Sequence, residues 1–456
     1  MSAERFTSNL RARKKRVPPL ARDPRSKDAK HSLDKETRIR MMAFAYYALV
    51  VFYALTFFRP EDLIPVLDAI PMAKIAGVIA IVGILAPVLA GNVRLTREVK
   101  ILGTLYLYLW ICIPTSIWLG GSFDLVVNDF TKMVVITITS IWVLNTLRRL
   151  SVIIGMQIAS TILLCIIAER HGLENGRMAG VGNAIADPND FALALCIILP
   201  FCVSYLLQSR SWFGKVTWIS AIAVVISAIV ATYSRGGFLA LVAVFVGIVV
   251  QFKISRKAVI GLIAVLVCSL LIATLFVGTS SYVDRLKSIS DPEKDASGSA
   301  LARKDLLLRA IDLSLHHPLF GVGPGQFALV SGAWHATHNT YLEFSAEAGI
   351  PSLILFIMLI VEAFRNLTFC RTVSIGPFWY LTGALRCSLV GYLVGAFFLS
   401  TAYHGSFYLL LAYSAALRNI SEHLEIVSVD ATKSWSGQVT DHPHTELHRL
   451  RDSKAL

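Results

Sequence analysis

The stretch that decides the fold is THNTYLEFSAEAG at residues 337–349, followed directly by the apolar run IPSLILFIMLIVEAF at residues 350–364. The first part is polar and holds one histidine and two glutamates. The second part has a single charged residue and the composition of a helix that lies in lipid. A polar segment that runs straight into an apolar one predicts a protein whose chemistry takes place at a membrane surface.

The composition of the whole chain extends this interpretation. Of the 456 residues, 55% are apolar and only 16% are charged, so a soluble globular protein is excluded. Apolar runs near the length of a membrane helix recur along the chain, whereas the strands of a membrane β-barrel would show alternation over about ten residues. The sequence therefore predicts an all-α, polytopic integral membrane protein.

We expect about twelve transmembrane helices and one long periplasmic loop that contains short helices. Every second connection between the spans is rich in Lys and Arg, which is typical of cytoplasmic loops and places both termini in the cytoplasm. The predicted spans are 41–58, 73–90, 100–119, 125–145, 150–168, 191–208, 217–234, 236–252, 258–277, 350–364, 378–400 and 404–417.

This topology divides the chain into five regions. They are a basic cytoplasmic tail that we expect to be disordered (1–40), transmembrane helices one to nine (41–277), the periplasmic loop with the catalytic residues (278–349), helices ten to twelve (350–418) and a second cytoplasmic tail (419–456). The net charge of +13 is concentrated in the first tail, where positive charge on the cytoplasmic side and contact with anionic lipids explain it better than nucleic acid does. The seven cysteines form no CxxC pair, so neither a disulfide framework nor a zinc site is indicated. We expect no metal and no cofactor.

Within the long loop, residues 300–316 have helical periodicity. The apolar face of this predicted helix holds Leu306, Leu307, Ala310, Ile311 and Leu313. Arg303 falls on the same face, whereas Arg309 lies on the polar face and can pair with Asp305 at i, i+4. A helix that rests its apolar face on the membrane domain would therefore point Arg303 inward.

Arg235 stands between two apolar helices in the sequence Ser234-Arg235-Gly236-Gly237. One interpretation is an arginine that reaches to the membrane interface. The other is an arginine held beside an anionic phosphate, because the two glycines permit a tight turn and a close approach of backbone to a ligand.

The outer loop at 169–190 leaves two interpretations open as well. Arg177 and Asp187 can line a polar cavity, or they can belong to a capped loop in which Asn189 or Asp190 begins the next helix.

In the opening stretch, Thr340 and Glu343 have the spacing of a capping box, which predicts a helix that starts near residues 338–340. His338 then lies at the first turn of a membrane helix. A lone histidine is more often structural than catalytic. Glu343 and Glu347 lie on one face at i, i+4, where we expect capping groups or groups that support a cavity.

The chain resembles the bacterial O-antigen ligase and O-antigen polymerase superfamily in four features taken together. They are the motif at 234–237, Arg303 ahead of the segment 317–323, the motif at 338–343, and the long loop between spans nine and ten. The loop at 177–190 also resembles the outer loop that precedes them in this family. The similarity covers roughly residues 170–365.

The resemblance implies a metal-independent glycosyltransferase of the bacterial inner membrane that acts on the periplasmic face in cell-surface polysaccharide biosynthesis. Its donor would be a glycan linked through diphosphate to undecaprenol, and its acceptor would be a lipid A–core sugar in a ligase or another glycan in a polymerase. By the family's pattern, His338 is the catalytic residue, and Arg235 and Arg303 bind the diphosphate. His335 lies three residues earlier and competes for the role of His338.

A carrier is the main alternative from another class, either a secondary transporter or a flippase for lipid-linked glycans, since about twelve spans is also a common size for carriers. Asp129 and Lys132, inside a predicted span, favour this alternative. A receptor or scaffold is a third interpretation, which predicts that a substitution of His338 leaves glycan chemistry unchanged.

Overall fold

The computed structural model describes residues 42–60, 72–89, 91, 93–171, 177–180, 187–253, 257, 259–261, 263, 264, 267, 299–332, 335–373 and 376–440. Within these residues the chain is helical and contains no strand, which confirms the predicted all-α class. The predicted tail at 1–40, residues 441–456 of the predicted tail at 419–456, the loop segment at 278–298 and most of the predicted span at 258–277 lie outside the described residues.

Among the described residues, seven segments are long and apolar enough to cross a membrane, so the protein is an integral membrane protein. They are formed by α4 (Met72–Leu89), α6 to α7 (Leu119–Val143), α8 (Leu147–His171), α9 (Pro188–Gln208), α10 (Trp212–Ala231), α11 (Arg235–Phe252) and α16 (Thr340–Val373). The helix Met42–Phe58 is shorter but apolar, and α5 (Arg97–Cys112), α17 (Pro377–Ala396) and α18 (Gly405–Thr440) coincide with further predicted spans. The count of twelve stays a prediction.

The helices α9, α11 and α17 pack tightly against one another, and glycines make this approach possible. A Cβ atom on Gly391 or Gly395 of α17 would lie 2.4 Å from Val244 or 2.6 Å from Leu193, respectively. Small residues at helix interfaces allow backbones to come close, and dispersion contacts then hold the helices together in lipid. This packing fixes the start of α11 beside α9 and the end of α17.

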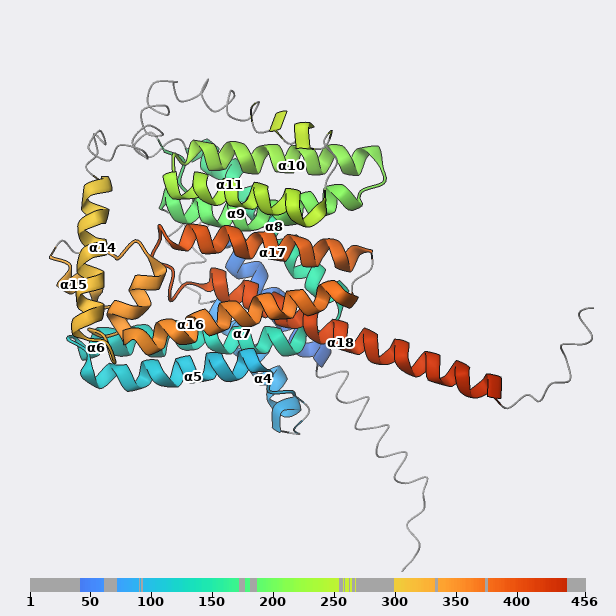
Figure 1. The fold of residues 1–456 in the computed structure, drawn as a ribbon, viewed down its shortest axis with the longest axis horizontal. Helices are drawn as coiled ribbons and strands as arrows, with labels where there is room; N and C mark the ends of the chain where they lie inside the picture. The colour runs from blue at the N-terminus through green and yellow to red at the C-terminus, as the bar shows by residue number, and fades with distance from the viewer. Residues whose placement is uncertain are drawn as a thin grey trace, which may run out of the picture.

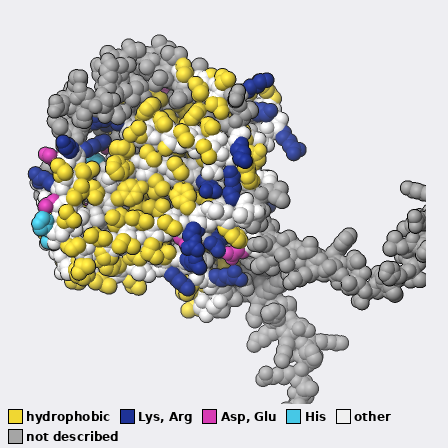
Figure 2. All heavy atoms as spheres, in the orientation of Figure 1, with side chains coloured by type: hydrophobic (Ala, Val, Ile, Leu, Met, Phe, Trp, Pro, Cys, Tyr) yellow, Lys and Arg dark blue, Asp and Glu magenta, His cyan; other side chains and the backbone are white. Residues whose placement is uncertain are grey.

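One helix runs across the others rather than along them. The helix α14 (Ser299–His316) crosses one end of the bundle and packs on the first part of α16 (Figure 1). Leu306 and Ala310 of α14 are buried with Phe327 of α15 (Phe327–Val330) and with Ala346 of α16. Figure 2 shows apolar side chains over the middle of one face of the bundle, with most of that face's Lys and Arg toward the end opposite α14.

The helix α16 is broken at Gly349, where φ is 77° and ψ is 170°. A Cβ atom at this position would lie 2.0 Å from the carbonyl oxygen of Leu319, so the positive φ and the close approach both require glycine. The predicted start of span ten at residue 350 coincides with this break, but the chain is already helical from Thr340. The short helix before the break belongs to the end of the bundle that α14 covers.

Candidate active site at the end of the bundle

His338 lies in a tight turn just before α16, with a positive φ of 51°. Its backbone N–H donates to Oγ of Ser400 at 2.9 Å, and this oxygen also lies 2.8 Å from Oγ1 of Thr337. The loop between α17 and α18 therefore positions His338. Its side chain is partly buried, whereas that of His335 is exposed.

The helix α16 starts at Thr340, within the predicted range of residues 338–340, but its cap differs from the sequence prediction. Oδ1 of Asn339 accepts the N–H groups of Tyr341 and Leu342, both at 3.0 Å, so Asn339 is the residue that caps the helix. The prediction that Thr340 and Glu343 form a capping box is wrong. The hydroxyl of Thr340 donates to the carbonyl of Leu399 at 2.7 Å, and Glu343 accepts the N–H of Ala402 at 3.0 Å. Contacts with the loop at 399–402 take both side chains away from the helix end.

The surroundings of His338 bring several predicted residues together. Burial lowers the pKa of His338 below its usual value, and the positive charge of Arg303 lowers it further. The carboxylate of Asp187 opposes this effect and raises the pKa, while His335 lowers it. Charges act this way over short distances, so Arg303 of α14 and Asp187 at the start of α9 both lie near the imidazole.

Arg303 lies on the side of α14 that faces the bundle, as the helical wheel predicts: it is partly buried, and Leu306 and Ala310 on the same side are buried. Two details of the prediction from the helical wheel are wrong. Ile311 is 39% exposed rather than packed on the bundle. Arg309 donates to the carbonyl of Ser331 rather than pairing with Asp305, because the loop after α15 comes back over the helix.

The outer loop contacts the junction of α10 and α11. Arg177 donates through Nε to the carbonyl of Thr232 at 2.9 Å and through Nη2 to Oδ1 of Asn189 at 3.1 Å. The same oxygen of Asn189 accepts the hydroxyl of Ser234 at 2.7 Å. The helix cap at α9 is Asp187, which accepts the N–H of Asn189 at 2.6 Å, so the prediction that Asn189 or Asp190 caps this helix is wrong.

Arg235 is the first residue of α11, directly after the cap Ser234, whose oxygen accepts the N–H of Gly237 at 3.0 Å. The two glycines allow close packing against protein: a Cβ atom on Gly236 would lie 2.7 Å from Phe398, and one on Gly237 would lie 2.5 Å from Ala192. Phe398 is two residues before Ser400, so the start of α11 borders the loop that holds His338. The N-terminus of a long helix also favours an anion at this position.

The three residues that the family resemblance singles out therefore border one end of the bundle, and a comparison with known families covers the same part of the chain. The family model described as O-antigen ligase matches residues 218–357. This segment is similar to the O-antigen ligase family. The match confirms the resemblance to the O-antigen ligase superfamily and spans Arg235, Arg303 and His338. A search among curated proteins found no match to the chain.

Inside the matched segment, Glu347 connects the glycine-rich segment at 321–325 to the start of α16. Its buried carboxylate accepts the N–H of Gly325 at 2.7 Å and that of Phe327 at 3.1 Å. Tyr403, in the loop before α18, is buried beside Glu347. Burial raises the pKa of this phenol, and the carboxylates of Glu347 and Glu343 raise it further. Both glutamates bind backbone amides and hold the scaffold of the site in place.

Close contacts of its glycines explain the glycine-rich segment at 321–325 as a rigid connector. A Cβ atom on Gly321 would lie 2.2 Å from the backbone of Glu347, and one on Gly323 would lie 2.0 Å from Ser116. Within the described parts of the chain, no three His, Cys, Asp or Glu side chains are grouped so that they could hold a metal ion.

Proposed function

We propose that this protein is a glycosyltransferase of the bacterial inner membrane, which transfers a glycan from undecaprenyl diphosphate to an acceptor hydroxyl on the periplasmic face. The observation that carries the proposal is the O-antigen ligase match at residues 218–357, which spans Arg235, Arg303 and His338. The family implies a membrane glycan ligase or polymerase. The effect of Arg303 and Asp187 on the pKa of His338 supports a shared site.

His338 is the proposed general base. Burial and Arg303 lower the pKa of His338, so its imidazole is neutral at neutral pH and can take a proton. In the proposed step, His338 removes the proton of the acceptor hydroxyl while that oxygen attacks the anomeric carbon of the donor sugar. The bond from this carbon to the phosphate oxygen breaks, and the electron pair leaves with undecaprenyl diphosphate.

Arg235 and Arg303 are the proposed ligands of the diphosphate. The negative charge on the leaving group grows in the transition state, and guanidinium groups stabilise it through charge-assisted hydrogen bonds. Arg235 is carried by the N-terminus of α11, whose dipole acts in the same direction. Arg303 reaches the site from α14 and acts on the pKa of His338. The proposed chemistry needs no cofactor beyond these side chains.

An apolar groove supports the lipid-linked nature of the donor. It has a volume of about 590 Å³ and lies between α11, the start of α16 and the end of α17. Its lining begins at Leu239, one helical turn after Arg235, and includes Tyr341, three residues after His338. A polyprenyl chain in this groove would have its diphosphate beside Arg235 and its apolar carbons in contact with lipid-facing side chains.

The carrier alternative receives less support. Asp129 and Lys132 form an ion pair of 3.3 Å, but their side chains are 62% and 53% exposed. They lie on the surface of the bundle, whereas a carrier binds its substrate near the middle of the membrane, between helices.

The test is transfer by the purified full-length protein in lipid nanodiscs, with a lipid-linked glycan donor, an acceptor and no ion gradient. We expect transfer by the wild type and a loss of at least about tenfold in Arg235→Gln and Arg303→Gln, because each substitution removes one charge-assisted interaction. Transfer that requires a gradient, or both variants at the wild-type rate, would refute the proposal. In a deletion strain, unattached lipid-linked polymer would indicate a ligase, and accumulated single repeat units would indicate a polymerase.

A further inference from the structure

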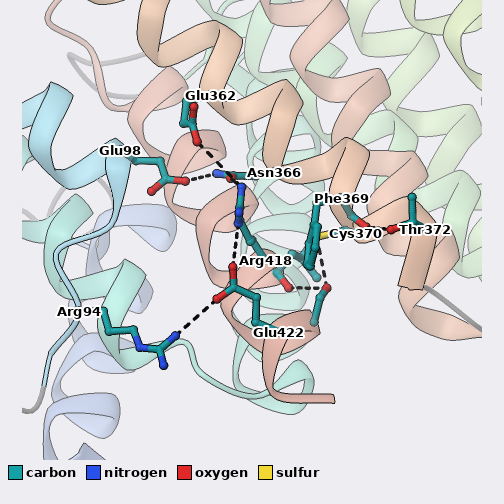
Figure 3. A network of polar contacts seen from close by, with 11 residues as sticks. Arg94, Glu98, Glu362, Asn366, Phe369, Cys370, Thr372, Arg418 and Glu422 are labelled. Atoms are coloured by element: carbon teal, nitrogen blue, oxygen red, sulfur yellow. Dashed lines mark hydrogen bonds and ion pairs between the residues drawn. The ribbon is translucent and has the colours of Figure 1, made fainter. Parts of the chain in front are cut away.

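The end of the bundle opposite α14 carries a second set of charged residues, which the proposed transfer does not use. It joins α5, α16 and α18, and Figure 3 shows its members pointing toward one another. They are Arg94, Glu98, Glu362, Asn366, Arg418 and Glu422. Along α16 this set begins more than twenty residues after His338, which corresponds to a distance on the order of 35 Å.

Contacts within this set neutralise its central arginine. Arg418 donates through Nε to Glu422 at 3.0 Å and through Nη1 to Oδ1 of Asn366 at 3.1 Å. Asn366 donates in turn to the buried carboxylate of Glu98. Arg418 also lies 4.0 Å from Glu362. The network fixes the side chains of α16 and α18 against α5.

Glu362 also orders the edge of the network toward the surface. Its Oε2 lies 3.3 Å from Nη1 of Arg365, whose side chain is more than half exposed. Glu362 itself is buried, with 3% of its surface exposed. A buried carboxylate that accepts from a partly exposed guanidinium reduces the freedom of that guanidinium, so Arg365 is held in place at the surface.

A cavity of about 440 Å³ lies beside Arg365, between α5 and α16. The residues that line this cavity lie on one face of α5 and on one face of α16. They are Arg97, Lys100 and Ile101 on α5, and Ile357, Met358, Val361, Glu362 and Arg365 on α16. Three cations are thus gathered at the end of a groove whose α16 wall is apolar nearer the middle of the span.

The cations of this cavity exceed the negative charge that the protein places there. Glu362 is the one carboxylate in the cavity lining, and it already serves Arg365 and Arg418. Among the described residues, the side chains of Arg97 and Lys100 make no hydrogen bond or ion pair. Ile357, Met358 and Val361 are each at least 44% exposed and face the surroundings of the bundle. A ligand that fits must be anionic at one end and apolar along the other.

We propose that this cavity binds an anionic phospholipid, with its phosphodiester at Arg97, Lys100 and Arg365 and an acyl chain along Ile357, Met358 and Val361. Basic pockets between membrane helices at the cytoplasmic side are suited to such headgroups. A zwitterionic lipid brings an ammonium group close to the same cations, so it binds more weakly. The bound lipid bridges α5 and α16 next to the buried network and stabilises this end of the bundle.

The test uses the full-length protein in detergent. Thermal stabilisation is titrated with phosphatidylglycerol, with phosphatidylcholine of the same acyl chains, and with soluble glycerol phosphate. We expect phosphatidylglycerol to stabilise the wild type at the lowest concentration. The double variant Arg97→Gln, Lys100→Gln should raise the midpoint concentration for phosphatidylglycerol about 10- to 30-fold, because each cation near an anionic surface strengthens binding about fivefold.

The matched control is the double variant Arg210→Gln, Lys215→Gln, which removes two exposed cations outside the cavity lining. Its titration should match that of the wild type. Equal stabilisation by both phospholipids, equal stabilisation by glycerol phosphate, or equal losses in both double variants would each overturn the proposal. Glycan transfer plays no part in this readout, so it is independent of the proposed function.

Discussion

The backbone N–H of His338 donates to the hydroxyl oxygen of Ser400 at 2.9 Å, across a separation of 62 residues. His338 has a positive φ, which costs a residue other than glycine on the order of 1 kcal/mol or more. The same hydroxyl contacts Thr337, so one side chain of the loop before α18 holds both residues of the strained turn. The position of the proposed base thus depends on a residue outside the segment that matches the O-antigen ligase family.

Replacement of Ser400 by alanine should reduce transfer. The N–H of His338 loses its partner, which costs about 1–3 kcal/mol, and the turn relaxes away from its positive φ. We expect kcat to fall about tenfold or more, with a smaller change in KM for the donor. Initial rates of purified Ser400→Ala measure this effect. The control is Ser406→Ala. Among the described residues, the hydroxyl of Ser406 makes no hydrogen bond. Equal rates for the two variants would refute the role of Ser400.

Replacement of Asp187 by asparagine should change the pH dependence. The carboxylate of Asp187 raises the pKa of His338 against the lowering effects of burial and Arg303. Without it the pKa falls further, so His338 stays neutral to lower pH, and the acidic limb of the pH profile of kcat/KM moves to lower pH. Asparagine is also a good helix cap, so the start of α9 is preserved. A profile of Asp187→Asn that is unchanged, or that moves to higher pH, would contradict the assignment.

Two glycines with positive φ separate the effect of backbone conformation from that of crowding. Gly349 and Gly376 have φ values of 77° and 63°, but a Cβ atom at Gly376 would have no neighbour within 4 Å, whereas one at Gly349 would collide with Leu319. We expect Gly376→Ala to cost about 1 kcal/mol of stability and Gly349→Ala several times as much. Thermal denaturation in detergent compares them, and equal losses would show that the contact with Leu319 does not matter.

The sequence patterns predict much of this fold because hydrophobic length and helical periodicity are local properties. The apolar runs become helices, the tight junction before Arg235 separates α10 from α11, and the 100° spacing places Arg303 on the inner side of α14. The apolar run that starts at residue 350 coincides with the break at Gly349. The sequence also predicts a helix start near residues 338–340, and α16 starts at Thr340, although its cap is Asn339 rather than a capping box of Thr340 and Glu343.

Contacts between distant segments are not visible in such patterns. No periodicity indicates that Ser400 binds the backbone of His338, or that Thr340 and Glu343 turn toward the loop at 399–402 instead of capping their own helix. The proximity of Asp187 to His338 also arises only when α9 and α16 meet in three dimensions. These long-range contacts determine the geometry of the site, which is why the sequence alone identifies candidate residues but not the residues that position them.

The initial rate of glycan transfer by His338→Ala, compared with His335→Ala, tests the central claim most directly. Both histidines lie in the same segment, but only the partly buried one is held by Ser400. Loss of a general base should reduce the rate about 10²- to 10⁴-fold in His338→Ala, and His335→Ala should stay close to the wild type. A His338→Ala protein that folds, inserts and transfers glycan at the wild-type rate would contradict the account.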